Sequence, residues 1–205
     1  MTPTRNSLRD LGTLVAVFSL CLLVWRQPDV EPQTSSAVAE ARKVLEADRV
    51  DDALAILERA AAADPNDPAA LAWLGNAQVR KAGKVPIFER PGWVRKGFTT
   101  LDEAVERFPD AFIVYVVRGT TAVNVPALFN KAVVAVKDLS TVVAMREKNP
   151  QTVPEAVMPS VYLNLGLAHK KNAQNDDARA AWEKGKKLYP SAPETRAIEK
   201  ELRSL

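Results

Sequence analysis

Two pairs of adjacent carboxylates, Asp51-Asp52 and Asp176-Asp177, have the type and spacing that acid–base or metal chemistry uses. Each pair precedes an apolar helical stretch, where carboxylates cap free N–H groups and interact favourably with the helix dipole. The single histidine, His169, cannot form an imidazole cluster with another histidine of the chain. We therefore expect no catalytic residue, no metal site and no cofactor. An enzyme that uses His169 as its base is a remote alternative.

Composition places the chain among globular proteins with a substantial core. It has 205 residues, of which 47% are hydrophobic and 26% charged, and its formal net charge is +3. This is too apolar for a disordered protein. The basic excess comes from Arg5, Arg9 and Arg26, which flank one apolar segment, so the rest of the chain is nearly neutral. Composition therefore gives no sign of a nucleic-acid partner. Because we expect no enzyme, we also expect no small-molecule substrate.

That apolar segment is typical of a membrane anchor. Fifteen residues without a charge run from Leu11 to Trp25. They span roughly 22 Å as a helix, against a hydrocarbon core of ~30 Å, and snorkelling arginines can extend the span. No small-residue cleavage site follows directly. We predict a transmembrane signal anchor at 11–26, after a short tail at 1–10. Cleavage, or lipidation at Cys21, is the alternative.

Basic residues predict the orientation of this anchor. Arg5 and Arg9 precede it, whereas Arg26 alone follows. Because basic residues favour the cytoplasmic side, we expect a single-pass protein of the bacterial inner membrane with a cytoplasmic N-terminus and a periplasmic body. A linker at 27–36 contains two prolines and no apolar periodicity. It connects the anchor to the body at 37–205.

The body repeats itself. The phrases VDDALAILERAAAADP (50–65) and NDDARAAWEKGKKLYP (175–190) align without a gap. The sequence here resembles the tetratricopeptide repeat (TPR) family, whose unit of about 34 residues carries W-x2-LG-x2-Y, then A-x3-F, then Pro. The stretch 159–190 fits this pattern best. Its matching residues are Tyr162, Leu165, Gly166, His169, Ala178, Trp182, Gly185 and Pro190.

The resemblance implies an all-α solenoid of about four helix pairs, closed by a C-terminal capping helix. Between Pro65 and Pro109 an insertion at 84–93 lengthens the second unit. The third unit has Arg118 where the family has Leu. Its β-branched runs at 112–117 and 132–136 favour strands by propensity, but the repeat register predicts helices.

In this family the first helices of the pairs line a concave groove that binds segments or helices of other proteins. Carried over by register, this resemblance implies a partner-binding groove drawn from the second, third and fourth units. Its residues are Trp73, Asn76, Val79, Arg80, Val116, Val117, Thr120, Val123, Asn124, Leu163, Asn164, Leu167, Lys170 and Lys171. A neighbouring helix of the same chain could also fill the groove.

Large apolar residues in loop-like contexts form a second candidate surface. They can tuck onto the body, meet a partner, or lie at the bilayer surface. They are Ile87, Phe88, Trp93, Leu128 and Phe129.

These observations predict a membrane-anchored TPR scaffold that mediates protein–protein interaction. We expect it to be an accessory or assembly subunit of an inner-membrane complex, with membrane-complex subunits or periplasmic proteins as partners. The alternative is a cleaved or lipidated soluble TPR protein of envelope biogenesis.

Overall fold

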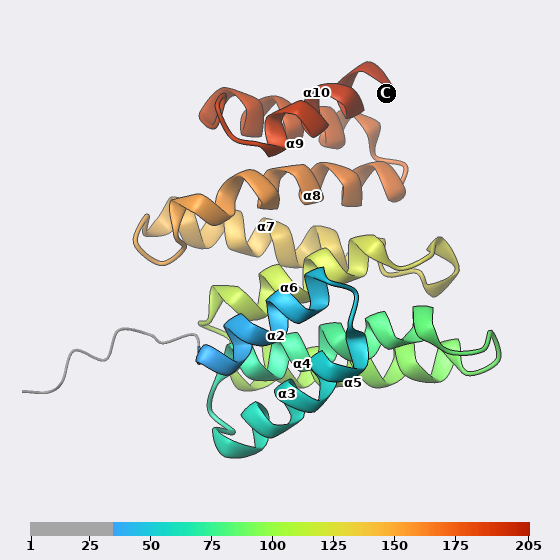
Figure 1. Ribbon diagram of the computed structural model, residues 1–205. Coiled ribbons are helices and arrows are strands. Elements are labelled where there is room, and N and C mark those ends of the chain that lie inside the picture. The colour runs from blue at the N-terminus through green and yellow to red at the C-terminus, as the bar shows by residue number, and fades with distance from the viewer. Residues whose placement is uncertain (1–34) are drawn as a thin grey trace, which may run out of the picture. The chain divides into compact units, whose positions relative to one another are not determined.

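The computed structural model describes residues 35–205, which form helices and turns without a strand (Figure 1). The tail at 1–10, the anchor at 11–26 and most of the linker at 27–36 lie outside this range. No helix within 35–205 combines the length and the apolarity needed to cross a membrane. The helices are α2 (Ser36–Glu46), α3 (Val50–Ala63), α4 (Pro68–Lys81), α5 (Arg90–Arg107), α6 (Phe112–Asn124), α7 (Ala132–Lys148), α8 (Met158–Lys171), α9 (Asn175–Leu188) and α10 (Glu194–Arg203).

The helices pack as consecutive antiparallel pairs, α2 with α3, α4 with α5, α6 with α7 and α8 with α9. The first helices also contact one another, so α4 lies between α2 and α6, and α6 lies between α4 and α8. α10 packs on both helices of the last pair. The predicted all-α solenoid of four helix pairs and a capping helix is therefore confirmed for the described residues.

Burial explains why the β-branched runs are helical. The runs 112–117 and 132–136 lie in α6 and α7, as the repeat register predicts. Val114 and Val117 are buried in one core cluster with Leu139 and Val142. Because tertiary packing outweighs the modest cost of a β-branched residue in a helix, the apolar pattern decides the outcome here.

The carboxylate pairs lie in the first turns of α3 and α9, where they interact favourably with the helix dipole. They are not N-caps, because Arg49 and Gln174 hold those positions. Asp51 instead accepts a hydrogen bond from Lys81 Nζ at 2.5 Å. Their role is therefore local and electrostatic, with one contact to the next pair.

The insertion at 84–93 is only partly a loop. A 3-10 turn spans Ala82–Lys84, and α5 already begins at Arg90, with Pro91 in its first turn. As a result α5 has 18 residues, whereas α3 and α9 have 14 each. The extra residues form one additional helical turn and an exposed tip at 85–89.

Glycines allow the paired helices to approach closely. A Cβ on Gly97 of α5 would lie 2.6 Å from the carbonyl oxygen of Gly75 of α4. A Cβ on Gly166 of α8 would lie 2.5 Å from Cδ1 of Trp182, whose indole Nε1 donates a hydrogen bond to Leu163 O at 3.0 Å. Because the indole is buried and held in place, it cannot move aside.

We predict opposite effects of the same substitution at two helical glycines. Gly166→Ala should lower the free energy of unfolding by about 1–3 kcal/mol, because the methyl group overlaps with Trp182. Gly92→Ala should raise it by up to about 1 kcal/mol, because a Cβ at this exposed helical position meets nothing within 4 Å. Urea unfolding of both variants measures the difference. Equal effects would contradict the close approach of α8 and α9.

An ion pair joins the second and third helix pairs at Arg118. Its Nε and Nη2 donate to the two carboxylate oxygens of Asp138 in α7, each at 2.7 Å, and its Nη1 donates to Asp102 of α5 at 2.7 Å. The Asp138 side chain is fully buried. Burial raises the pKa of the Asp138 carboxyl above its ordinary value, and Arg118 opposes this rise.

We predict that Arg118→Leu lowers the free energy of unfolding by about 3–5 kcal/mol at neutral pH, because it leaves the buried Asp138 charge unpaired. With the opposing cation removed, the pKa of Asp138 rises further. The folded variant then binds a proton more readily than the unfolded chain, so its deficit should shrink as the pH falls from 7 to about 4.

The double variant Arg118→Leu/Asp138→Leu is the control for this prediction. It removes both charges, and the second leucine fills space that the guanidinium leaves. Its stability should return close to that of the parent and lose the extra pH dependence. A double variant as unstable as Arg118→Leu at every pH would show that lost packing, rather than the unpaired charge, destabilises the single variant.

Candidate interaction groove

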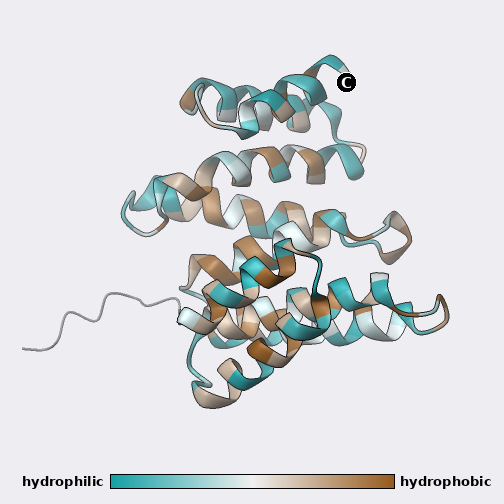
Figure 2. Cartoon of the chain, in the orientation of Figure 1, coloured by the Kyte–Doolittle hydropathy of each residue, from teal (hydrophilic) through white to brown (hydrophobic). Residues whose placement is uncertain are grey.

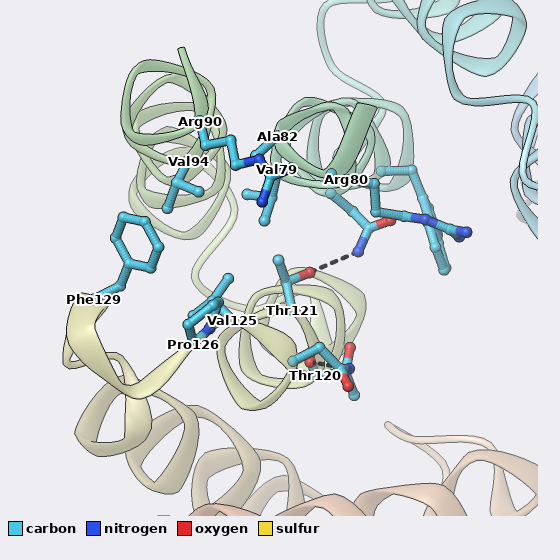
Figure 3. Close-up of a pocket in the computed structure, with 14 residues that line it drawn as sticks. Val79, Arg80, Ala82, Arg90, Val94, Thr120, Thr121, Val125, Pro126 and Phe129 are labelled. Carbon is cyan, nitrogen blue, oxygen red and sulfur yellow. Dashed lines mark hydrogen bonds between the residues drawn. The ribbon is translucent and has the colours of Figure 1, made fainter. Parts of the chain in front are cut away.

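A cavity of about 490 Å³ lies between α4, the start of α5, α6 and the turn that follows α6 (Figure 3). Its apolar lining includes Trp73, Val79, Val94, Val125 and Phe129. Figure 3 shows Val94 of α5 and Phe129 facing the cavity from one side, with Thr121 of α6 across from Val79. The cavity therefore follows the seam where the second and third helix pairs meet.

A hydrogen-bonded chain fixes the polar side of this cavity. Thr121 Oγ1 donates to Val117 O at 2.6 Å and accepts from Asn76 Nδ2 at 2.8 Å. Since the hydroxyl proton is already donated, Asn76 must turn its NH2 group towards Thr121. Its Oδ1 is buried and has no hydrogen-bond partner among residues 35–205. A buried acceptor of this kind lowers stability by about 1–3 kcal/mol.

Two arginines place positive charge at the cavity. Arg80 Nη2 donates to Leu45 O of α2 at 2.7 Å, and Arg90 Nε donates to Val85 O at 3.2 Å. Figure 3 shows the Arg90 side chain extending from α5 towards Val79 and Ala82. These bonds leave other guanidinium N–H groups of both residues for a ligand.

Asp48, in the turn between α2 and α3, pairs with Lys84 and lies 3.8 Å from Arg80, which lines the cavity. The hydrogen bond from Lys84 lowers the pKa of Asp48. Arg42 of α2 lies 5.0 Å above the Trp73 ring. The first helix pair therefore helps to position both Arg80 and Trp73.

About half of the groove expected from the sequence lines this cavity. The six residues that do so are Trp73, Asn76, Val79, Arg80, Thr120 and Asn124. Phe129, expected as a loop contact, also lines it. Sequence reasoning missed Thr121, Val125 and Pro126, and it missed Arg90 and Val94 at the start of α5. Two signals could have found some of them: Arg90 lies inside the insertion at 84–93, and Val125 and Pro126 lie in the same loop as Leu128 and Phe129.

Three valines expected in the groove lie elsewhere. Val117 and Val123 are buried in the main core cluster, and Val116 is half-buried against the same cluster. Because α6 is covered by α4, α7 and α8, only a narrow arc of its surface faces the cavity. The expectation that Val117 and Val123 present free groove surface was therefore wrong.

The fourth-unit residues are separate from the cavity because the chain itself covers several of them. Leu163 and Leu167 pack with Trp182 and Ile198, and Leu202 of α10 packs on the same cluster. Lys170 Nζ donates to Glu201 Oε2 of α10 at 2.9 Å. α10, rather than the insertion, thus occupies this part of the expected groove.

Asn164 and Lys171, the other two fourth-unit residues, bond to backbone carbonyls. Asn164 Nδ2 donates to Ser160 O within α8 at 2.8 Å. Lys171 Nζ donates to the carbonyls of Val123 and Val125 at the end of α6. Lys171 therefore holds the base of the turn that follows α6.

The loop residues divide into two groups. Trp93 and Phe129 are half-buried against the main core cluster. Ile87, Phe88 and Leu128 are exposed. The first two residues tuck onto the body, and the last three project from it.

His169 closes the turn between α8 and α9. Its Nδ1 lies 3.2 Å from Gln174 Oε1 and 4.0 Å from Asp177 Oδ2. Gln174 N donates to His169 O at 2.9 Å, and Ala173 between them has a positive φ of 58°. This arrangement supports a structural role for His169. Within residues 35–205 no group of three or more His, Cys, Asp or Glu side chains is placed to hold a metal ion.

Comparison with known proteins supports the repeat architecture. TTC0263, a thermophilic TPR protein of Thermus thermophilus, superposes with a TM-score of 0.69 at 18% identity, covering 95% of this chain and 93% of that one. A mutant of MamA superposes with a TM-score of 0.50 at 24% identity, covering 80% and 81%. No protein-family model matches the chain, and no curated protein matches it in sequence. The similarity in structure, together with the paired helices and their packing glycines, shows that the chain has the fold of tetratricopeptide repeat proteins.

Proposed function

We propose that this protein is a membrane-anchored scaffold that binds a segment of a partner protein in the cavity between α4 and α6. The observation that carries the proposal is the cavity itself, which combines about 490 Å³ of space, an apolar lining and two arginines. Pockets of this size and chemistry are typical of binding sites.

The chemistry of the cavity indicates the kind of segment it binds. Trp73, Val79 and Phe129 suit an apolar or amphipathic helix, which places side chains at i, i+3 and i+4 in a groove. Arg80 and Arg90 suit an acidic side chain beside that apolar face. A partner N–H that met Asn76 Oδ1 after a small side-chain rotation would remove an unsatisfied acceptor.

The anchor at 11–26 gives the scaffold its proposed place in the cell. We infer that it holds the protein in the bacterial inner membrane with the repeats in the periplasm. Tethering restricts the repeats to the membrane surface and raises their effective concentration towards membrane-bound partners. An accessory or assembly subunit of an inner-membrane complex fits this combination of anchor and groove. A cleaved or lipidated protein of envelope biogenesis is the alternative.

We predict that gentle detergent extraction of the full chain yields a stoichiometric companion protein, and that Thr120→Arg removes it. The arginine would fill the cavity, so the companion should fall at least about tenfold relative to the parent, as expected when a buried interface loses about 1.4 kcal/mol or more. Quantitative mass spectrometry of the purified complex measures the ratio.

The matched control is Ser140→Arg, which makes a similar change at an exposed position of α7 away from the cavity. It should retain the companion. A chain that purifies alone as a monomer would refute the complex-subunit role. Equal loss of the companion from both variants would place the interaction outside the cavity.

We predict that the mature protein keeps its N-terminal segment. The intact mass should include residues 11–26, because no small-residue cleavage site follows them closely. Alkaline carbonate should not extract the protein from membranes, and a reporter fused to the C-terminus should be active in the periplasm. A mass that begins beyond residue 26, or a lipid attached to Cys21, would instead support the alternative.

A further inference from the structure

Large exposed apolar side chains concentrate at two neighbouring loops. Among residues 35–205, Ile87, Phe88, Leu128, Val133 and Leu188 are exposed by 75%, 80%, 79%, 57% and 51%. The first four belong to the tip at 85–89 or to the segment 125–133, and Leu188 alone lies elsewhere. Scattered single apolar residues are common on protein surfaces, but three in two short loops, with Val133 in the first turn of α7 directly after the second loop, mark an interaction surface.

The two loops project from the same side of the helix stack (Figure 1). The cavity described above is lined by Gly83 and Arg90, which flank the first loop, and by Val125, Pro126 and Phe129 of the second. Phe129 also lies with Pro91 and Lys131 in a second hollow of about 340 Å³. Figure 2 shows hydrophobic colour at both tips. We refer to Ile87, Phe88, Leu128 and Val133 as the loop-tip group.

Both loops are held in defined conformations. Glu89 N donates to Pro86 O at 3.0 Å, and Phe129 N donates to Pro126 O at 3.0 Å. Asn130 ends the second turn in the left-handed region, and Lys171 of α8 binds the carbonyl of Val125 at 3.4 Å. The exposed side chains are therefore presented on ordered turns, which lowers the entropy cost of binding.

Unpaired cations outnumber acidic residues in the segments that carry the loop-tip group. The segments 84–99 and 125–137 contain six Lys or Arg residues and one acidic residue, Glu89. Of the six, Lys84 pairs with Asp48. The other five form no ion pair with any residue between 35 and 205; they are Arg90, Arg95, Lys96, Lys131 and Lys137. Lys96 and Lys131 lie over the rings of Trp93 and Phe98, at 5.0 and 4.3 Å.

We propose that the loop-tip group inserts into the interface of an anionic phospholipid bilayer while the cations of the same segments bind the headgroup phosphates. Apolar side chains on convex tips need no matching pit in a bilayer, whereas a protein partner would have to provide one for each tip. Cations next to inserted apolar groups are what an anionic membrane surface attracts. The four apolar residues of this surface do not line the α4–α6 cavity, which the surface adjoins at Arg90, and they add a lipid contact to the proposed scaffold.

The contact orients the protein as well as binding it. Two apolar tips on one side of the stack, together with the cations of the same segments, would fix the rotation of the helices relative to the membrane plane. A single chain tether cannot do this. The groove would then be presented to membrane-bound partners at a constant height and angle.

Lipid-borne quenching of an environment-sensitive dye tests the proposal in the full chain. Leu128→Cys is labelled in a Cys21→Ser background and reconstituted in nanodiscs of 70% phosphatidylcholine and 30% phosphatidylglycerol that carry a spin-labelled lipid. We expect strong quenching at 128, and equally at a label introduced by Phe88→Cys. A label introduced by Leu188→Cys should stay in water.

Variants separate the charge and apolar contributions. Arg95→Gln and Lys96→Gln should each lower the ratio of docked to undocked chains roughly fivefold, because one cation near an anionic surface contributes about that factor. Ile87→Ser should reduce the quenching of a label at 128, whereas Leu188→Ser should not. Nanodiscs of phosphatidylcholine alone, or high salt, should also lower the ratio of docked to undocked chains, as the charge variants do.

Three outcomes would overturn the proposal. Labels at 88 and 128 could remain as exposed to water as the label at 188. Docking could be equal with and without phosphatidylglycerol. The labels could become shielded only when a companion protein is present, which would make the loops a protein interface. Thr120→Arg should leave quenching unchanged, so a failure of the lipid contact is distinguishable from a failure of the groove.

Discussion

The close approach of paired helices is the constraint on which the rest of this structure depends. Gly75 and Gly97 let α4 and α5 meet almost backbone to backbone, and Gly166 lets α8 receive the Trp182 indole. Side chains of ordinary size at these positions would push the helices apart. Each pair would then cover less of its neighbour, and the shared core that runs from α4 to α8 would open. The groove between α4 and α6 exists because these spacings are kept.

The third helix pair shows how a repeat can change its chemistry and keep its geometry. Where the repeat pattern has an apolar residue, Arg118 crosses to a fully buried carboxylate on α7 and an exposed one on α5. Such an arrangement holds together because every charge has a partner, whereas an apolar side chain would pack with few directional requirements. The ion pair therefore specifies how the second and third pairs are placed relative to each other.

The regular spacing of small and apolar residues made the fold predictable from the sequence. Part of the groove could not be predicted, because neighbouring helices bury some of its expected residues. Small residues such as Gly166 and the alignment of Ala53 with Ala178 were enough to locate the helices, even where β-branched runs favoured strands. Repeat register assigns a residue to a helix but does not say how much of that helix its neighbours cover. Val117 and Val123 were misplaced for this reason.

Side-chain contacts between residues that are distant in sequence also could not be predicted from the sequence alone. Asp138 is 20 residues from Arg118 in the sequence. Glu201 of α10, which accepts a hydrogen bond from Lys170 of α8, is 31 residues from it. Neither contact leaves a local pattern. By contrast, the insertion at 84–93 was visible as a break in spacing, and it supplies both a wall of the cavity, at Arg90, and one of the exposed tips.

The position of α10 has a consequence for the exposed face of the last helix pair. Its inner side, through Ile198 and Leu202, shields the apolar flank that α8 and α9 would otherwise leave open, while its outer side carries Lys200 and Arg203. A repeat array without such a capping helix exposes an apolar terminal face. Another copy can stack on that face, and the array can then grow into a filament. Here α10 covers that face of the last helix pair, which disfavours stacking of another copy on it.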